Sequence, residues 1–204
     1  MAKSIPETGP HLAEITSLNF DVDLKIAYAR DDNFTGAPVY GRPACYLHHD
    51  AAALLLQAID LANDIGLRLL IYDGFRPTEA QWVLWNHTPD PNYLADPRRG
   101  SPHSRGVAVD LTLIDPNGVP LEMGTEFDDL TPLSHHGTRE IPGSAQNNRH
   151  TLLGLMTAVG WDFYRNEWWH YQMFDSHRYP LISDFELDHS MMPPGGKDHR
   201  EPVP

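Results

Sequence analysis

Short runs of apolar residues mark the candidate strands of this chain. Residues 22–29 (VDLKIAYA) alternate apolar and polar positions, and residues 67–73 (LRLLIYD) form a continuous apolar run. In 107–113 (VAVDLTL), the apolar side chains at odd positions share one face, because strand side chains alternate with a period of two. These patterns predict three strands, and the aromatic segment 161–174 (WDFYRNEWWHYQMF) is also β-prone.

A helical period predicts three helices between these segments. The first begins with Asp50 as its cap, carries an apolar stripe of Leu54, Ala58, Leu61 and Ile65, and ends at Gly66. The second follows Pro77 through TEAQWVLWN, and the third runs from Ser144 to Gly160.

Strands and helices are intermixed without a regular βαβ rhythm, and the chain has no internal repeat. The pattern therefore predicts a single-domain α+β fold with a central, mostly antiparallel sheet and flanking helices. We expect this domain to span residues 1–190. Residues 191–204 lack any period and are predicted to form a disordered tail.

Composition and charge narrow the class of protein. The chain has 204 residues, of which 41% are hydrophobic, so it can bury a sizeable core. Its formal net charge of −13 argues against nucleic acid as a partner, and no apolar stretch is long enough to span a membrane. The N-terminal segment lacks the apolar region of a secretory signal, so a cytoplasmic location is expected. A homo-oligomer is left open.

Cysteine usage excludes one kind of metal site. Cys45 is the only cysteine, so neither an intrachain disulfide nor a cysteine-based zinc site can form. We expect Cys45 to be a small buried apolar residue.

The predicted strand 107–113 carries a carboxylate on its second face. Asp110 points away from the apolar positions, toward a face of small residues beside a glycine-containing turn that bears His103. Aspartate and histidine are suitable metal ligands, but a lone strand aspartate is more often a solvated residue. The pair His103 and Asp110 therefore needs support from elsewhere in the chain.

Glu167 and His170, in the segment EWWH, are the second candidate pair. A histidine ligand near a glutamate can supply both a metal site and a general base. The alternative is an edge strand whose tryptophans belong to the core. Residues three apart point to opposite faces of a strand, so the two can share a site only if Glu167 lies in a turn or bulge.

His103, Asp110 and His170 together would leave the fourth position of a zinc ion open for water, as in catalytic zinc sites. Arg76 follows a buried strand in a tight turn and could direct positive charge toward that water; the alternative is an ordinary surface arginine.

Four further histidines are weaker candidates as ligands. His135 and His136 follow a Pro-Leu-Ser turn and have no adjacent acidic residue, so we expect structural or surface roles. His48 and His49 precede the first helix and are expected to be polar loop residues.

Several strings in the chain carry a family resemblance. Residues 101–110 match the pattern S-x-H-x-x-G-x-A-x-D and resemble the LAS-type zinc peptidases. The chain more closely resembles the D-alanyl-D-alanine dipeptidases of the vancomycin-resistance type and their chromosomal relatives. The supporting strings are DNFTG (32–36), YDGFRP (72–77), HSRGVAVDLTL (103–113), MGTEFD (123–128), SHH (134–136) and EWWHY (167–171). The resemblance covers roughly residues 22–183 and is weakest between 129 and 143.

The resemblance implies a set of roles for individual residues. It implies zinc bound by His103, Asp110 and His170, with Glu167 as the general base and Arg76 stabilising the transition state. It also implies that Tyr28, Ser101 and Asp128 lie around the free ammonium group of a dipeptide.

The expected function is therefore zinc-dependent hydrolysis of D-alanyl-D-alanine to two D-alanines. One alternative is a D,D- or L,D-carboxypeptidase that acts on peptidoglycan stem peptides, which would share the metal motif. Another is a non-catalytic zinc-containing binding module. The presence of both Glu167 and Arg76 argues against this second alternative, because a structural zinc needs neither.

Overall fold

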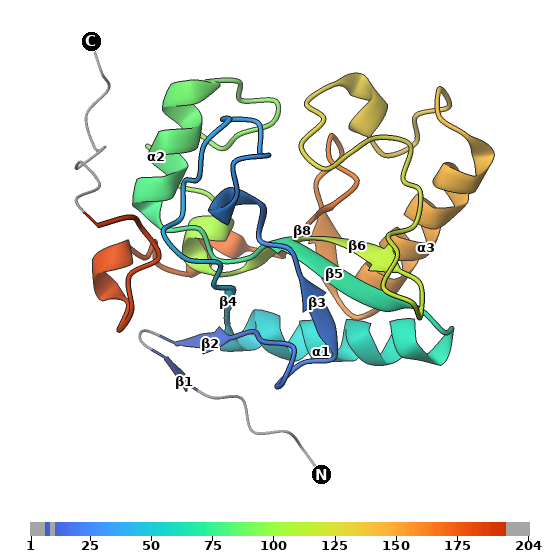
Figure 1. Cartoon of the computed structure of the whole chain (residues 1–204), viewed down its shortest axis with the longest axis horizontal. Coiled ribbons are helices and arrows are strands. Elements are labelled where there is room, and N and C mark those ends of the chain that lie inside the picture. Colours follow the sequence, from blue (N-terminus) through green and yellow to red (C-terminus); the bar gives the residue numbers. More distant parts are fainter. Residues whose placement is uncertain (1–6, 9–10, 195–204) are drawn as a thin grey trace.

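A five-stranded sheet forms the centre of the computed structural model, which describes residues 7–8 and 11–194 (Figure 1). Its strands, in spatial order, are β3 (Val22–Leu24), β5 (Arg68–Asp73), β6 (Ala108–Ile114), β8 (His170–Met173) and β7 (Trp161–Phe163). Only β3 and β5 run parallel, and the other neighbours are antiparallel. The predicted α+β fold with a mostly antiparallel sheet is confirmed.

A second, smaller sheet was not predicted. It consists of β1 (Glu7–Thr8), β2 (Leu12–Glu14) and β4 (Tyr46–His48), all antiparallel. Strands of two or three residues are too short for the period of two to become visible in a sequence.

Three helices flank the central sheet: α1 (His49–Asp64), α2 (Thr78–His87) and α3 (Gly143–Ala158). Helix α1 runs along the lower side of the sheet in Figure 1, α3 lies at the right, and long loops cover the upper side. Helices α1 and α3 contact each other, and α3 also packs against β6 and β7. The three helices were predicted within a few residues of their observed bounds.

The start and the buried face of α1 differ from the prediction. His48, not Asp50, is the N-cap, and its Nδ1 accepts a hydrogen bond from the Asp50 N–H at 3.2 Å. His48 is therefore the last residue of β4 and the cap of α1, not a loop residue, and His49 is the first residue of the helix. The buried positions are Ala51, Ala52, Leu55, Ala58, Ile59 and Ala62. Of the predicted stripe, Ala58 is buried, Leu54 and Leu61 are half-buried, and Ile65 is exposed.

Two predicted strands are corrected in detail. The strand expected over 22–29 ends at Leu24, and residues Ala27–Ala29 form a 3₁₀ turn in which Tyr28 is buried. The backbone carbonyl of Tyr28 accepts from the N–H groups of Val39 and Tyr40, both at 2.8 Å, so this carbonyl bonds to a loop instead of a strand. In β6 all seven residues are buried, so both faces of this strand are covered, not only the apolar one.

The end of the described chain is part of the fold. Met191 is completely buried, its N–H donates to Asp184 at 2.6 Å, and its carbonyl accepts from the Gly41 N–H at 2.6 Å. The folded region therefore reaches at least Met191, the first residue of the predicted tail, and residues 195–204 lie outside the described part. Cys45 is buried, as expected.

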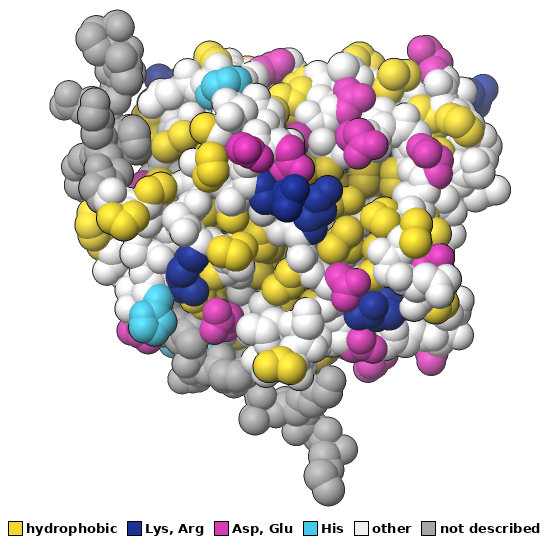
Figure 2. Space-filling model, viewed as in Figure 1, with side chains coloured by type: hydrophobic (Ala, Val, Ile, Leu, Met, Phe, Trp, Pro, Cys, Tyr) yellow, Lys and Arg dark blue, Asp and Glu magenta, His cyan; other side chains and the backbone are white. Residues whose placement is uncertain are grey.

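The surface reflects the acidic composition of the chain. Figure 2 shows acidic side chains spread over the face viewed there, whereas Lys and Arg form a few separate groups. This face offers no continuous basic surface for a phosphate backbone. Among the described residues, no helix is long and apolar enough to cross a membrane.

Candidate active site

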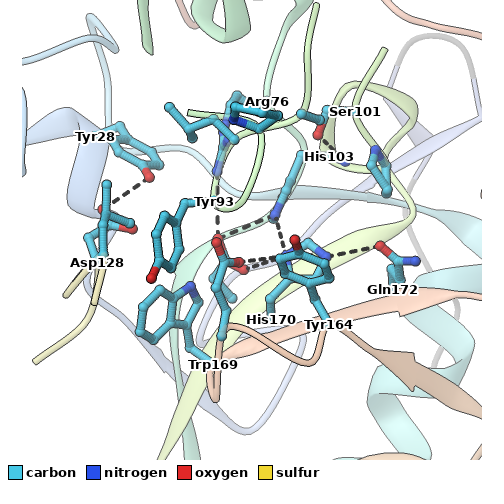
Figure 3. Close-up of a pocket in the computed structure, with 17 residues that line it drawn as sticks. Tyr28, Arg76, Tyr93, Ser101, His103, Asp128, Tyr164, Trp169, His170 and Gln172 are labelled. Carbon is cyan, nitrogen blue, oxygen red and sulfur yellow. Dashed lines mark hydrogen bonds and ion pairs between the residues drawn. The ribbon is translucent and has the colours of Figure 1, made fainter. Parts of the chain in front are cut away.

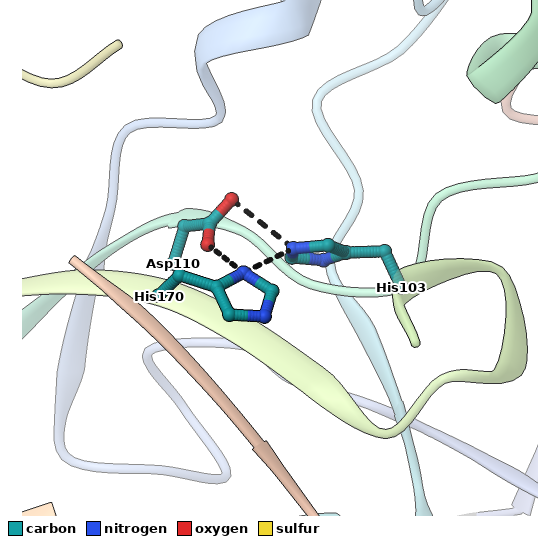
Figure 4. A group of neighbouring side chains, drawn as sticks. All are labelled: His103, Asp110 and His170. Atoms are coloured by element: carbon teal, nitrogen blue, oxygen red, sulfur yellow. Dashed lines mark hydrogen bonds and ion pairs between the residues drawn. The ribbon is translucent and has the colours of Figure 1, made fainter. Parts of the chain in front are cut away.

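Three side chains from separate elements converge on one point (Figure 4). His103 comes from the 3₁₀ turn His103–Arg105, Asp110 from β6 and His170 from β8. Asp110 and His170 are direct partners across the antiparallel pair β6–β8. His170 Nδ1 lies 3.0 Å from Asp110 Oδ1 and 3.1 Å from His103 Nε2, and His103 Nε2 lies 3.3 Å from Asp110 Oδ2.

The turn that carries His103 depends on a glycine. Gly106 has a left-handed backbone with φ of 69°, and a Cβ there would meet Leu12 Cδ2 at 2.7 Å. Only glycine fits both the conformation and the space. This turn directs the His103 side chain toward β6.

Each of the two histidines has a hydrogen-bond acceptor at the ring nitrogen that faces away from Asp110. His103 Nδ1 lies 2.7 Å from the carbonyl oxygen of Gly74, and His170 Nε2 lies 3.1 Å from Gln172 Oε1. Because both partners accept hydrogen bonds, each of these nitrogens can carry the ring proton. His103 Nε2 and His170 Nδ1 are then available, together with the Asp110 carboxylate, to bind a cation.

The donor set fits zinc in size as well as in charge. Zinc–ligand bonds of about 2.0–2.1 Å in tetrahedral geometry separate neighbouring donor atoms by about 3.3 Å. His103 Nε2 and His170 Nδ1 are 3.1 Å apart, and each of them lies 3.0–3.3 Å from one of the two oxygens of Asp110. Burial raises the pKa of Asp110, but His103 and His170 together hold it below its usual range, so its carboxylate is ionised. Among the described residues, these three form the one group of His, Cys, Asp or Glu that could hold a metal ion.

Arg76 is a buried residue, so the alternative of an ordinary surface arginine is wrong. Its side chain is 5% exposed, its Nε donates to Asp73 Oδ2 at 2.9 Å, and its Nη1 donates to Gln81 Oε1 at 3.0 Å. Nη2 lies 3.6 Å from Asp110 Oδ2, on the side of the candidate metal ligands. The hydroxyl of Tyr40 donates to the second oxygen of Asp73 at 2.9 Å and thereby fixes the group that orients Arg76.

Glu167 lies in the turn between β7 and β8, which is the condition under which it could share a site with His170. The Glu167 N–H donates to the Tyr164 carbonyl at 3.2 Å, and the Glu167 carbonyl accepts from the His170 N–H at 3.4 Å. Its Oε2 lies 3.9 Å from His170 Nδ1. Burial, followed by the charges of Asp110 and Asp128, raises the pKa of Glu167 well above its ordinary value.

A pocket of about 210 Å³ joins all eight residues predicted for the site (Figure 3). It is smaller than the roughly 300–1,000 Å³ typical of pockets for drug-sized ligands. The eight residues are Tyr28, Arg76, Ser101, His103, Asp110, Asp128, Glu167 and His170. The pocket therefore suits a small polar ligand that lies next to the candidate metal ligands His103, Asp110 and His170.

Tyr28 and Asp128 form one wall of this pocket, and Ser101 lies apart from them. The Tyr28 hydroxyl donates to Asp128 Oδ2 at 3.0 Å. Burial, followed by the charge of Asp110, raises the pKa of Asp128 to about 8. Ser101 lies on the His103 side in Figure 3, where its Oγ accepts from the His103 N–H at 3.2 Å.

The site carries an excess of negative charge. Four buried acidic groups, those of Asp73, Asp110, Asp128 and Glu167, surround a single guanidinium, that of Arg76, and burial together with the charge of Asp110 raises the pKa of Asp128 and Glu167. Buried charges are costly unless opposite charges balance them. A bound divalent cation would offset two negative charges and would favour the ionised form of these groups.

The four other histidines stay outside the pocket. His135 Nε2 lies 3.3 Å from the Tyr93 hydroxyl, and the ring of His136 packs edge-on against Phe163. Burial, followed by Arg149, lowers the pKa of His136 to about 4. His48 and His49 belong to the start of α1.

Sequence reasoning missed the residues that support the site. Gln172 lies two positions after His170 and thus on the same face of β8, so the period of two could have identified it. Asp73 stands three residues before Arg76 within YDGFRP, and its charge could have indicated an ion pair with Arg76. Tyr93 also lines the pocket, but its proline-rich loop gives no pattern that would place it there.

Comparison with known proteins identifies the family. The model of the peptidase M15 family, described as D-ala-D-ala dipeptidase, matches residues 8–189. The chain belongs to this family. It is 41% identical to a D-alanyl-D-alanine dipeptidase of Escherichia coli (strain K12) over 173 residues, which cover 85% of this chain and 90% of the relative. The dipeptidase of Streptomyces coelicolor is 35% identical over 78% of this chain and 90% of its own length.

A dipeptidase of Enterococcus faecalis is 35% identical over 72% of this chain and 84% of its own length. The chain is thus a zinc metallopeptidase that hydrolyses D-alanyl-D-alanine, and the predictions of family, activity and cofactor are confirmed. The carboxypeptidase and the non-catalytic module are not supported.

Proposed function

We propose that this pocket hydrolyses D-alanyl-D-alanine with His103, Asp110 and His170 as the zinc ligands and Glu167 as the general base. The observation that carries the assignment is the free carboxylate of Glu167. Of the four carboxylates at the site, it alone makes no side-chain hydrogen bond to any described residue, although it lines the pocket next to the ligand cluster.

Each remaining group has a separate task in the reaction. When bound, zinc supplies a Lewis acid that polarises the peptide carbonyl and lowers the pKa of water. Glu167 Oε2 accepts a proton from the attacking water and later delivers it to the leaving amine. The Nη2 group of Arg76 stabilises the negative charge that develops on the carbonyl oxygen, because the guanidinium is already held in place before the reaction.

Asp128 and Tyr28 bind the ammonium group of the dipeptide in this proposal. Asp128 is one of three non-glycine residues with a left-handed backbone among those described, and its φ is 60°. Such conformations are strained and persist where the surroundings impose them, often at functional sites. Zinc and the ammonium group would together bring three positive charges to these acidic groups. Ser101, on the His103 side of the pocket, stays a predicted substrate-binding residue.

The pocket volume of about 210 Å³ supports a dipeptide as substrate rather than a longer stem peptide. The test compares hydrolysis of D-alanyl-D-alanine, its N-acetyl derivative and a pentapeptide ending in D-alanyl-D-alanine, with zinc content measured on the same sample. We expect one zinc per chain and turnover of the free dipeptide alone. Equal turnover of the acetylated dipeptide would refute the ammonium site.

The cytoplasmic location and the homo-oligomer stay predictions. Fractionation of cells that produce the full chain tests the first, and light scattering of the purified protein tests the second.

A further inference from the structure

The loop between Met123 and His135 brings Asp128 to the pocket. Its regular structure is limited to the 3₁₀ turn Pro132–Ser134, so backbone ladders do not fix its course. Leu130, from the same loop, also lines the pocket. The left-handed backbone of Asp128 needs support from the surrounding contacts.

Arg149 of α3 supplies hydrogen bonds to both ends of this loop. The side chain reaches Met123, Thr125, Leu133 and His135. Arg149 Nε donates to the Met123 carbonyl at 2.6 Å, and Nη2 donates to Thr125 Oγ1 at 3.3 Å. On the other stem, Nη1 donates to the carbonyls of Leu133 at 2.9 Å and His135 at 3.3 Å. One guanidinium thus ties the two stems together.

The Arg149 guanidinium is buried without an ion-pair partner among the described residues, which is energetically unfavourable. Arg149 is 3% exposed, and none of the described carboxylates lies within ion-pair distance of it. Burial lowers the pKa of Arg149 to about 10, so the group still carries its charge at neutral pH. Its planar fork of donors matches four acceptors that are distributed over two chain segments, which a lysine ammonium cannot span.

The same cluster reaches the turn that carries the general base. Thr125 Oγ1 accepts from Trp168 Nε1 at 2.9 Å, and the Trp168 N–H donates to the Ser134 carbonyl at 3.1 Å. The Arg149 guanidinium lies over the Trp168 ring, 5.7 Å from its centroid. Trp168 follows Glu167 directly. The Asp128 loop and the Glu167 turn are therefore tied to one another through Arg149 and Thr125.

We infer that Arg149 is a positioning residue for the ammonium subsite, because it fixes both stems of the loop that presents Asp128. It does not touch the pocket itself. The inference rests on the proposed role of Asp128 in binding the ammonium group.

The test compares Arg149→Gln with Arg139→Gln, which removes the charge of an exposed arginine ahead of α3. For each zinc-loaded enzyme, kcat and KM are measured with D-alanyl-D-alanine and with its N-acetyl derivative. A small misplacement of a binding group can cost about 100-fold, so we expect KM for the free dipeptide to rise about 10- to 100-fold in Arg149→Gln. The preference for the free over the acetylated dipeptide should fall by a similar factor, while zinc stays near one per chain.

A merely structural role would give a different pattern. It would lower the amount of active enzyme, and thus apparent kcat, but leave KM and the preference for the free dipeptide unchanged; this result would overturn the inference. Arg139→Gln should match the wild type in all three quantities.

Two further variants keep the test decisive if Arg149→Gln does not fold. Arg149→Lys should keep the charge and show an intermediate rise in KM. Thr125→Val removes the shared hydroxyl and should raise KM in the same direction, and an unchanged KM in both would overturn the inference. Asp128→Asn distinguishes the proposed ammonium site from the positioning role of Arg149. If Asp128→Asn keeps the preference for the free over the acetylated dipeptide, the ammonium site is wrong. If Asp128→Asn loses this preference but the Arg149 and Thr125 variants keep it, only the positioning role is wrong.

Discussion

Replacement of Glu167 by glutamine separates proton transfer from metal binding. The substitution keeps the shape of the side chain and removes its ability to accept a proton. Glu167 Oε2 lies 3.9 Å from His170 Nδ1, whereas His103 Nε2 and His170 Nδ1, two of the proposed ligand atoms, are 3.1 Å apart and each lies 3.0–3.3 Å from an oxygen of Asp110. Glu167 is thus beside the ligand cluster and not part of it, so Glu167→Gln should retain close to one zinc per chain.

The expected loss of activity follows from the role of a positioned base. Such a group contributes about two to four powers of ten in rate, and each power of ten corresponds to 1.36 kcal/mol, so kcat should fall by an amount equivalent to roughly 3–5 kcal/mol of barrier. KM should change little, because the proposed ammonium site, formed by Asp128 and Tyr28, lies at another wall of the pocket.

The assay measures released D-alanine and bound zinc on the same preparation, with wild type and Glu167→Asp beside Glu167→Gln. The shorter acid should recover part of the rate, because it restores a proton acceptor at a slightly wrong distance. Loss of zinc in Glu167→Gln would show that Glu167 is a ligand. Undiminished kcat with full zinc content would refute its assignment as the base.

The remaining predictions concern the metal ligands, their support and the pH dependence of stability. His170→Ala should lose most of the zinc, measured by elemental analysis after dialysis, whereas His135→Ala should keep it. Gln172→Leu removes the acceptor that fixes the His170 ring and should weaken zinc about 10- to 100-fold in competition with a chelator. The pKa of Asp128 is raised to about 8, so its carboxyl is protonated in the folded metal-free protein at pH 6 but ionised in the unfolded chain. The contribution of Asp128 to the free energy of unfolding is present at low pH and is lost as the pH rises through about 8. The Tm of chelated wild type should therefore fall relative to that of Asp128→Asn between pH 5 and 8, and a constant difference would contradict the assignment.

The sequence predicted the elements that carry long patterns and the residues that belong to specific motifs. Helix α3 was predicted within a residue or two of its observed bounds. The strand β6 was found with Asp110 on its second face. These signals are local, because they depend only on spacing along one element.

The sequence could not show contacts between distant segments. The fixation of Arg76 depends on Tyr40, 36 positions earlier in the numbering, acting through Asp73. The strand prediction at Tyr28 failed for the same kind of reason, since its backbone carbonyl bonds to the loop at Val39 and Tyr40. Tertiary hydrogen bonds overrode the local alternation of apolar and polar residues.

The pairing of Asp110 with His170 across β6 and β8 also bears on how the chain finds its fold. A strand that is buried on both faces, as β6 is, has no solvent side to distinguish one alignment from its one-residue neighbour. A slip of one position would turn one of the two ligands to the opposite face of the sheet and dismantle the site. With Asp110 and His170 as the proposed ligands, zinc would bind only one alignment of the two strands and would stabilise that alignment over its neighbours during folding.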